Sequence, residues 1–253
     1  MTYHGHRPTT PGLEVIRLDL RDASAAEEAV AALRPDVVIH TAYVQDGPDL
    51  EAVTVAGSGA VARAARSVGA RLIHMSSDVV FDGEHVGSYA DDALPAPISP
   101  YGRAKAAAER LVADAHPGAL IVRTSLIYGG AEPSKHETLA LDAAAGRADV
   151  AFFTDELRCP VVVDDLAAAL LELAVIDVFG TLNVAGADIV SRYMFAQLVV
   201  EAAGGDAGRL RSAVSAGSGV PRPRNCALDS RRAQTMISTR LRGASQVLRP
   251  RLE

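Results

Sequence analysis

The chain has 253 residues, a formal net charge of −6 and an apolar content of 49%. This composition excludes a disordered or fibrous protein, and the length is enough for one body with an appended lobe. The negative charge and the lack of a long Lys/Arg run argue against a nucleic-acid partner. Apolar runs fall far short of the roughly 20 residues that cross a bilayer, and nothing resembles a secretory signal, so a cytoplasmic protein without membrane contact is expected.

Strands and helices are predicted to alternate through the first half of the chain. In chain order, the pattern predicts a strand at 15–20, a helix at 22–33, a strand at 36–40, a helix at 50–68, a strand at 71–75, a helix at 101–115, a strand at 119–124 and a helix at 134–146. Asp22 or Ser24 suits the cap of the first helix. Strands alternating with helices at this spacing predict an α/β protein with a parallel sheet covered on both faces.

The order becomes less regular beyond residue 146. The pattern predicts a strand at 150–153, a helix at 164–175, a strand at 181–184, a helix at 191–203, a linker or loop at 204–223 and a helix at 230–248. We therefore divide the chain into a sheet-bearing unit of residues 1–150 and a mixed segment of residues 151–253. The second part is expected to add late sheet elements and a small substrate-binding lobe.

Tyr101 and Lys105 stand four residues apart at the start of a predicted helix, so their side chains share one face. A phenol has an ordinary pKa of about 10, and a neighbouring ammonium favours the phenolate, which makes the pair a candidate acid/base centre. The spacing by itself also suits a half-buried Tyr beside a solvated Lys. Upstream, a strand delivers Ser76 and Ser77 to its carboxyl end, where open α/β sheets place ligands. A hydroxyl there can hydrogen-bond a substrate carbonyl, although Ser77 alone also suits a turn or cap.

The motifs around these residues resemble a known family. SSDVVFDG at residues 76–83, followed by PISPYGRAK at residues 97–105, resembles the extended short-chain dehydrogenase/reductases, and most closely the dTDP-4-dehydrorhamnose reductases. The resemblance continues in order at residues 123–125, 128–129, 155–160, 164–166, 191–192 and 222–229. The last stretch, RPRNCALD, is similar to an Arg-Pro-x-Asn-Ser-x-Leu-Asp signature that separates these reductases from related epimerases and dehydratases.

This resemblance implies a doubly wound, Rossmann-like parallel sheet with a small C-terminal substrate lobe. Residues 1–150 would form an incomplete dinucleotide-binding domain. The implied activity is NAD(P)H-dependent reduction of a 4-keto-deoxysugar nucleotide, in which hydride reaches C4 and a proton reaches the oxygen. The expected partner is therefore a small-molecule sugar nucleotide, and a homodimer is the candidate assembly.

The resemblance also implies roles for single residues. Ser77 would orient the substrate carbonyl, Tyr101 would donate the proton, and Lys105 would lower the pKa of Tyr101 and bind the nicotinamide ribose. Cofactor contacts are further implied for Asp19, Leu20, Thr41, Ala42, Tyr43, Ser76 and Thr124, and substrate contacts for Asp78, Arg158, Pro160 and Arg224. For Arg158 and Arg224, a surface ion pair is the alternative to a diphosphate contact.

The start of the chain departs from the family. The family opens with a strand, a Gly-x-x-Gly-x-x-Gly turn and a helix that meets the cofactor pyrophosphate, whereas Gly5 and Gly12 neither have this spacing nor follow a strand. Roughly the first 30 residues of a complete βαβ unit are missing. In the strand order 3-2-1-4-5-6 the absent strand is central, so two unpaired edges are expected inside the sheet. Either the true start lies upstream, which we favour because the rest of the site is intact, or the chain is a degenerate member with weakened cofactor binding.

Smaller departures bear on the cofactor and the site. Thr54 stands where the family usually carries Asn, and Val79 where it often carries Tyr. After the expected second strand the chain offers His4, His6 and Arg7 and no acidic residue, which favours NADPH, with NADH as the alternative. A solvated loop would explain the same three residues.

Other classes of function were weighed against the reductase. The seven histidines lack metal-ligand spacing, so no metal site is expected, and two distant cysteines build no disulfide framework. The main rival is a non-catalytic NADP-binding or regulatory protein, since one relative of these reductases is the regulatory β subunit of methionine adenosyltransferase. The missing glycine-rich turn favours that rival, and the intact Ser77, Tyr101 and Lys105 argue against it. A nucleotide-sugar epimerase or dehydratase would use the same Tyr and Lys, but the 222–225 stretch disfavours it.

Overall fold

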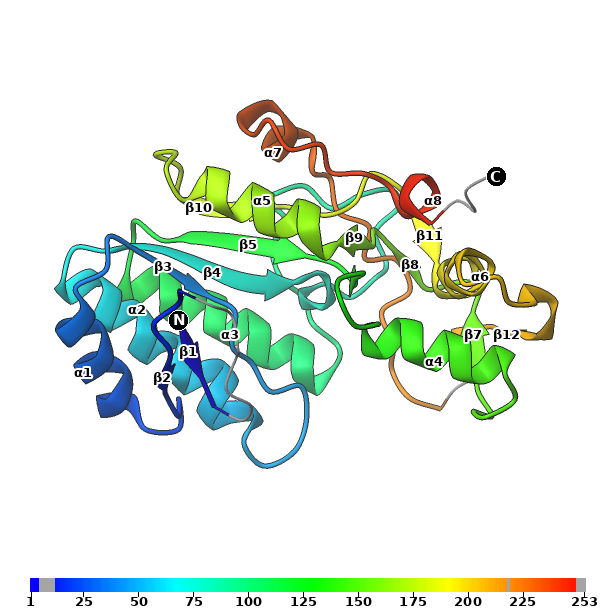
Figure 1. Cartoon of the computed structure of the whole chain (residues 1–253), viewed down its shortest axis with the longest axis horizontal. Helices are drawn as coiled ribbons and strands as arrows, with labels where there is room; N and C mark the ends of the chain where they lie inside the picture. The colour runs from blue at the N-terminus through cyan, green and yellow to red at the C-terminus, as the bar shows by residue number, and fades with distance from the viewer. Residues whose placement is uncertain (5–11, 218, 249–253) are drawn as a thin grey trace.

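A parallel four-stranded sheet forms the centre of the molecule. The computed structural model describes residues 1–4, 12–217 and 219–248 (Figure 1). Its sheet runs in the order β10-β5-β4-β3, from β3 (Val37–His40), β4 (Arg71–Ser77), β5 (Leu120–Thr124) and β10 (Gly180–Asn183). Every neighbouring pair in this sheet is parallel, as the alternation of strands and helices predicts.

Helices cover both faces of this sheet, which confirms the doubly wound architecture. One face carries α1 (Ala23–Leu33), α2 (Gly57–Ser67) and α3 (Pro100–Ala115), and the other carries α5 (Val163–Leu173) (Figure 1). Side chains alternate between the faces along each strand. Leu72 and Ile121 join the core under α2 and α3, whereas Ile73, Leu120 and Val122 join the core under α5.

The N-terminal strands form a separate small sheet. β1 (Thr2–Tyr3) and β2 (Ile16–Arg17) pair in parallel with each other and with no strand of the central sheet. Among the described strands, β3 has a partner on one side alone. Among the described strands, β1 and β3 therefore each have one unpaired edge, which agrees with the two unpaired edges expected where the central strand is missing. The preference for NADPH rested on His4, His6 and Arg7. His6 and Arg7 lie outside the described residues, and His4 Nε2 lies 3.3 Å from the Asp19 carboxylate.

A smaller lobe is built mainly from short paired strands and two helices. It contains α4 (Lys135–Ala144) and α6 (Arg192–Ala202), together with the pairs β6 (Ile127–Tyr128) with β9 (Val161–Val162), β7 (Ala151–Phe153) with β12 (Arg211–Ala213), and β8 (Leu157–Arg158) with β11 (Val190–Ser191). Its core holds Tyr128 and Phe195 in an edge-to-face contact with centroids 5.4 Å apart. Residue 150, the boundary expected from the sequence, does not separate the two parts. The helix α4 lies before this residue and packs in the lobe, whereas α5 and β10 lie after it and belong to the sheet-bearing part. The chain therefore crosses between the two parts more than once.

Two predicted segments differ from the structure. The helix predicted at 230–248 is two short helices, α7 (Arg231–Met236) and α8 (Ala244–Val247). The chain between them is held by α5, because the backbone N–H groups of Ser238 and Thr239 donate to the Glu172 carboxylate. The linker predicted at 204–223 contains β12, which extends the lobe. The remaining short helical segments are η1 (Leu50–Ala56, a π-helix that leads into α2), η2 (Asp78–Val80), η3 (Ala207–Arg209) and η4 (Ser215–Gly217).

Candidate active site

One large pocket opens at the carboxyl ends of β3, β4 and β5. Its volume is about 690 Å³. The strand ends and the first turns of α3 form one wall, and the N-terminal turns of α4, α5 and α6 with the 156–158 and 222 segments form the other. The pocket therefore lies between the sheet and the smaller lobe, at the edge where open α/β sheets bind ligands.

The start of α3 is fixed closely against the end of β4. Ser99 caps the helix, since its Oγ accepts from the Gly102 N–H at 3.0 Å, and Pro100 follows in the first turn, where its fixed φ suits a helix. A Cβ on Gly102 would lie 2.2 Å from the carbonyl oxygen of Val79. Glycine at this position therefore lets the first turn approach the η2 backbone and brings Tyr101 beside the residues that follow β4.

Tyr101 and Lys105 share the pocket wall with Tyr43. The Lys105 side chain is buried, and its Nζ donates to the carbonyl oxygen of Met75 at 3.0 Å. The same nitrogen lies 5.2 Å from the centroid of the Tyr43 ring, and the rings of Tyr43 and Tyr101 are 5.7 Å apart. The predicted acid/base pair is thus brought together, with a second aromatic ring over the ammonium.

Burial has the largest effect on the pKa values of both Tyr101 and Lys105. It raises the pKa of Tyr101 above its ordinary value, and the neighbouring Tyr43 and Asp78 add to this effect. Burial lowers the pKa of Lys105 to about 8, while the Glu109 carboxylate opposes that change. The direction for Tyr101 is therefore opposite to the one expected from Lys105 alone, because desolvation of the phenolate outweighs the ammonium. The phenol stays protonated at neutral pH.

Ser77 and Asp78 close the pocket at the end of β4. The Ser77 hydroxyl donates to Asp78 Oδ1 at 3.2 Å, and Asp78 Oδ2 accepts from the Ser125 hydroxyl at 2.7 Å. Burial raises the pKa of Asp78, and the nearby Arg158 opposes this rise. The Arg158 Nε lies 3.7 Å from Asp78 Oδ2.

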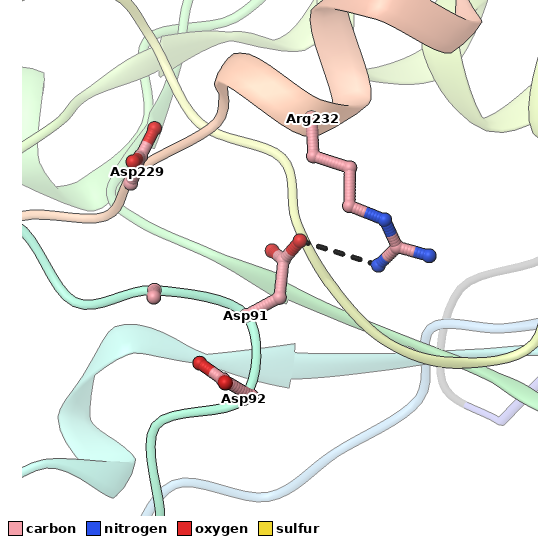
Figure 2. Close-up of a pocket in the computed structure, with 5 residues that line it drawn as sticks. Asp91, Asp92, Asp229 and Arg232 are labelled. Atoms are coloured by element: carbon pink, nitrogen blue, oxygen red, sulfur yellow. Dashed lines mark hydrogen bonds and ion pairs between the residues drawn. The ribbon is translucent and has the colours of Figure 1, made fainter.

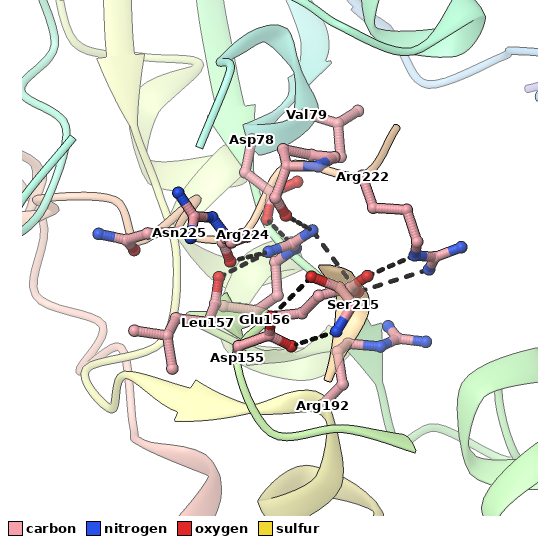
Figure 3. A network of polar contacts seen from close by, with 12 residues as sticks. Asp78, Val79, Asp155, Glu156, Leu157, Arg192, Ser215, Arg222, Arg224 and Asn225 are labelled. Carbon is pink, nitrogen blue, oxygen red and sulfur yellow. Dashed lines mark hydrogen bonds and ion pairs between the residues drawn. The ribbon is translucent and has the colours of Figure 1, made fainter. Parts of the chain in front are cut away.

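Arg158 lines the pocket, but most of its donors hold the protein together. Arg158 belongs to the network of polar contacts that includes Asp78, Leu157 and Arg224, which are labelled in Figure 3. Its guanidinium donates to the backbone carbonyl oxygens of Leu157, Pro223 and Arg224 at 2.7 to 3.0 Å. Arg158 thereby fastens β8 to the segment after residue 222.

The lobe side of the pocket is basic. Lys135, His136, Arg192 and Arg222 all line it. An Nη2 donor of Arg192 lies 3.3 Å from His136 Nδ1, so this ring nitrogen accepts and the neutral ring carries its proton on Nε2. Burial, with Arg158 next in effect, lowers the pKa of Arg192 to about 10. None of the ion pairs within the described residues involves Arg192, whereas Arg222 pairs with the buried Glu156.

The sequence analysis gave no role to these basic residues. Arg192 was noted next to Ser191 as part of the family resemblance. The one signal that singles it out is a cation in the first turn of a helix, where the helix dipole disfavours positive charge.

Several residues to which the family resemblance gave a binding role do not line the pocket. Two others line it, but their hydroxyl groups donate to other protein atoms. Asp19, Leu20, Ala42, Pro160 and Arg224 are not among the residues that line it. Asp19 pairs with Arg21, and Arg224 pairs with Glu84 on the surface. Ser76 and Thr124 do line the pocket, but the hydroxyl of Ser76 donates to Glu109 and that of Thr124 to the Val184 carbonyl oxygen. Thr41 and Tyr43 line it as expected.

A second, smaller cavity of about 390 Å³ lies apart from this site. Its walls are Ala90, Asp91, Asp92, Asp229 and Arg232 (Figure 2). The Asp91 carboxylate accepts from Arg232 at 3.2 Å and from the backbone N–H of Asn183 at 2.6 Å. Its acidic groups do not match a phosphorylated ligand, so the larger pocket is the candidate active site.

The described residues contain neither a candidate metal-binding cluster nor a candidate membrane-spanning helix. No group of three or more His, Cys, Asp and Glu side chains among them is placed to hold a metal ion. In the same part of the chain, no helix has the length and apolar character needed to cross a membrane.

Comparison with known proteins decides the family. The family model described as RmlD substrate binding domain matches residues 4–250. The chain belongs to this family. The resemblance to the dTDP-4-dehydrorhamnose reductases is thereby confirmed, since the reductase of that name from Mycobacterium tuberculosis is 38% identical over 227 residues, which are 84% of this chain and 74% of that protein.

Two further relatives mark the breadth of the RmlD family. Methionine adenosyltransferase 2 subunit beta from Pongo abelii is 30% identical over 92% of this chain and 73% of its own length. The crystal structure of dTDP-4-dehydrorhamnose reductase from Bacillus anthracis in complex with NADP has a TM-score of 0.83 at 24% identity, and covers 93% of this chain and 88% of that one. The second likeness shows the shared fold.

Proposed function

We propose that this RmlD family member is an NADPH-dependent reductase of a 4-keto-deoxysugar nucleotide, with NADH as the alternative cofactor. The observation that carries the proposal is the convergence of Ser77, Tyr101 and Lys105 on one pocket at the strand ends. The relatives support the reaction class, because the similar proteins from Mycobacterium tuberculosis and Bacillus anthracis are dTDP-4-dehydrorhamnose reductases and the latter binds NADP.

The donor set near Lys105 fits the nicotinamide end of the cofactor. An ammonium has three N–H donors, and in the described structure the Lys105 Nζ donates to one acceptor, the Met75 carbonyl oxygen. Two donors are therefore free for ribose hydroxyls, with Thr41 and Tyr43 on the adjoining wall. The fit to the cofactor therefore rests on the residues at this nicotinamide end of the site. A bound reduced nicotinamide would supply the hydride.

The residues of the chain supply the proton and the geometry. Tyr101 is protonated at neutral pH, because burial raises its pKa, and it can donate its proton to the carbonyl oxygen as charge develops there. In the described structure the Ser77 hydroxyl donates to Asp78 Oδ1. Turned from Asp78 toward the substrate, it would donate a second hydrogen bond to the same carbonyl oxygen and fix its direction. The Lys105 ammonium stabilises the phenolate that Tyr101 becomes as its proton leaves.

The basic side of the pocket matches the diphosphate of a nucleotide sugar. Arg192, Lys135 and Arg222 face this space from the lobe. Arg192 takes part in no ion pair within the described residues, so its charge is available to an anion. A diphosphate gives several acceptor oxygens that a guanidinium can bind in pairs. The sugar ring would then extend from these residues toward Tyr101.

A turnover assay tests the proposal. NADPH consumption is followed by absorbance with a dTDP-linked 4-keto-6-deoxysugar, for the wild type and for Tyr101→Phe, Lys105→Ala and the control Tyr193→Phe. We expect Tyr101→Phe to lower kcat by about 10²-fold to 10⁴-fold, because it removes the proton donor alone. Tyr193 is not among the pocket residues, so its variant should match the wild type. Turnover that survives in Tyr101→Phe would contradict the assigned chemistry.

The second candidate is a non-catalytic NADP-binding or regulatory protein. The similarity to methionine adenosyltransferase 2 subunit beta favours it. NADPH binding is measured by nicotinamide fluorescence, in parallel with turnover. Saturable binding without consumption of NADPH by any 4-keto sugar nucleotide would replace the reductase with this candidate.

A further inference from the structure

A buried carboxylate, Glu109, joins α3 to the two strands beside it. Its Oε1 accepts from the Ser76 hydroxyl at 2.5 Å and from Arg123 Nε at 3.0 Å, and its Oε2 accepts from Arg123 Nη2 at 2.8 Å. The side chains of Glu109 and Arg123 are 7% and 4% exposed. Because Ser76 lies in β4 and Arg123 in β5, this one carboxylate fixes three elements relative to one another.

The elements that Glu109 joins are those that carry the proposed chemistry. Tyr101, Lys105 and Glu109 follow one another at four-residue intervals on α3, so they lie along one face of the helix. Ser76, which Glu109 holds, directly precedes Ser77 at the end of β4. The contact therefore sets the position of the Tyr and the Lys relative to the Ser.

We propose that Glu109 is a positioning residue for Lys105. Its hydrogen bonds to β4 and β5 hold the Lys105 ammonium against the Met75 carbonyl oxygen, and its negative charge keeps that ammonium protonated in a buried site. The catalytic consequence rests on the proposed reductase function. The effect on the charge of Lys105 exists in the ligand-free protein and can be measured there.

Glu109 is the carboxylate that opposes loss of the proton from the Lys105 ammonium. Burial lowers the pKa of Lys105 to about 8, and Glu109 raises it in turn. The other titratable or charged groups that face this region lie on each of the neighbouring elements. They are Tyr101 on α3, Tyr43 after β3, His40 on β3, His74 on β4, Asp78 in η2 beside Tyr101, and Arg123 on β5 behind Glu109. Burial lowers the pKa of both histidines, so they stay neutral near pH 8.

The sequence makes a direct measurement simple, because the chain has two lysines, Lys105 and Lys135. Protein labelled with ¹³C-lysine gives two Cε signals, which the Lys135→Arg variant assigns. We expect the Lys105 signal to titrate near pH 8 in the wild type and about one pH unit lower in Glu109→Gln. Glu109→Asp keeps the charge and should restore most of the shift. An unchanged midpoint in Glu109→Gln would overturn the proposal.

Two further variants separate charge from folding. Glu109→Gln leaves the Arg123 charge buried without its partner, which can unfold the protein, whereas the double variant Glu109→Gln/Arg123→Gln removes both charges. The double variant should also titrate below the wild type at Lys105. Asp165→Asn breaks another carboxylate–guanidinium pair, with Arg242, and should lower stability without moving the Lys105 midpoint.

Activity completes the test. If the protein is a reductase, the alkaline limb of its kcat profile should move to lower pH in Glu109→Gln, in parallel with the Lys105 signal. A uniform loss of kcat at every pH, with the limb unmoved, would mean that Glu109 is merely structural. If the wild type shows no turnover, the proposed function fails, and the lysine titration still decides the role of Glu109.

Discussion

Thr54, which stands where the family usually carries Asn, holds the loop that follows β3. Its hydroxyl donates to the Val44 carbonyl oxygen and accepts from the Val44 N–H, both at 2.8 Å. An amide side chain in the usual Asn offers the same donor and acceptor. Thr54 therefore holds the loop after β3 that presents Tyr43 to Lys105.

This role of Thr54 can be tested with an isosteric change. Thr54→Val should lower the free energy of unfolding by about 1–3 kcal/mol, because two backbone groups of Val44 lose their partner. It should also weaken NADPH binding through the loosened Tyr43 loop, whereas Thr54→Asn should retain both properties. Urea unfolding and fluorescence titration measure the two effects. If Thr54→Val bound NADPH with the affinity of the wild type, the Tyr43 loop would not contribute to cofactor binding.

Arg192 gives a second prediction at this scale. Arg192→Ala should raise KM for the sugar nucleotide by about tenfold or more, because a charge-assisted hydrogen bond to the diphosphate is lost. The Kd for NADPH should stay unchanged, since Arg192 lies on the lobe side of the pocket. Arg231→Ala is the control, because Arg231 is 91% exposed and pairs with Asp229 on the surface. An equal rise in the KM for the sugar nucleotide and the Kd for NADPH would contradict the assignment of Arg192 to the diphosphate site.

At the scale of elements, the close contact between α3 and η2 positions the acid/base pair. Gly102→Ala should push the first turn of α3 away from the Val79 carbonyl oxygen, lowering stability by about 1–3 kcal/mol and displacing Tyr101. Gly59→Ala in α2 is the matched control, since its Cβ would make ordinary contacts and Ala is the better helix former. Thermal unfolding and kcat measure both variants. Full activity in Gly102→Ala would show that the close approach is not needed.

The elements also show how far sequence reasoning reaches. Local signals placed α1, because Asp22 caps it as predicted, and they placed α3 and β4, because a cap and an apolar strand are visible in the sequence. Contacts between distant segments were not visible. The break between α7 and α8 depends on Glu172 of α5, and the placement of Arg192 inside the pocket depends on how the lobe folds over the strand ends.

At the scale of the whole molecule, a buried histidine pair couples folding to pH. His40 and His74 lie side by side on β3 and β4 with ring centroids 5.3 Å apart, and neither His74 ring nitrogen has a partner among the described residues. Burial lowers the pKa of His40 to about 4 and that of His74 well below its usual range. Both histidines are therefore neutral in the folded protein at neutral pH.

The sign of the resulting pH dependence follows from linkage. Below an unfolded pKa of about 6.5 the unfolded chain binds more protons than the folded one, so the free energy of unfolding falls as pH falls. His40 alone should remove about 2 kcal/mol between pH 7 and pH 5. His74→Leu removes one titrating group without breaking a hydrogen bond and should reduce this slope. Urea unfolding at several pH values tests it, and a slope unchanged in His74→Leu would contradict the account.

The arrangement of the whole molecule explains why its two parts must act together. The sheet presents Ser77 and the helix α3 that packs on it presents Tyr101 and Lys105, whereas the lobe presents the basic residues. The side chain of Lys135 on α4 donates across the pocket to Gln45 after β3. Substrate bound between them would be held by its diphosphate on one side and its keto group on the other.

Transfer of deuterium tests the central claim most directly. The protein is incubated with NADPH deuterated at the transferable C4 position and a dTDP-linked 4-keto-6-deoxysugar, and the product is examined by ¹H NMR. The account predicts one deuterium at C4 of the sugar with the wild type, and very little with Tyr101→Phe. NADPH that binds but carries no deuterium to the sugar would contradict the reductase and leave a protein of this family that binds the cofactor without using it.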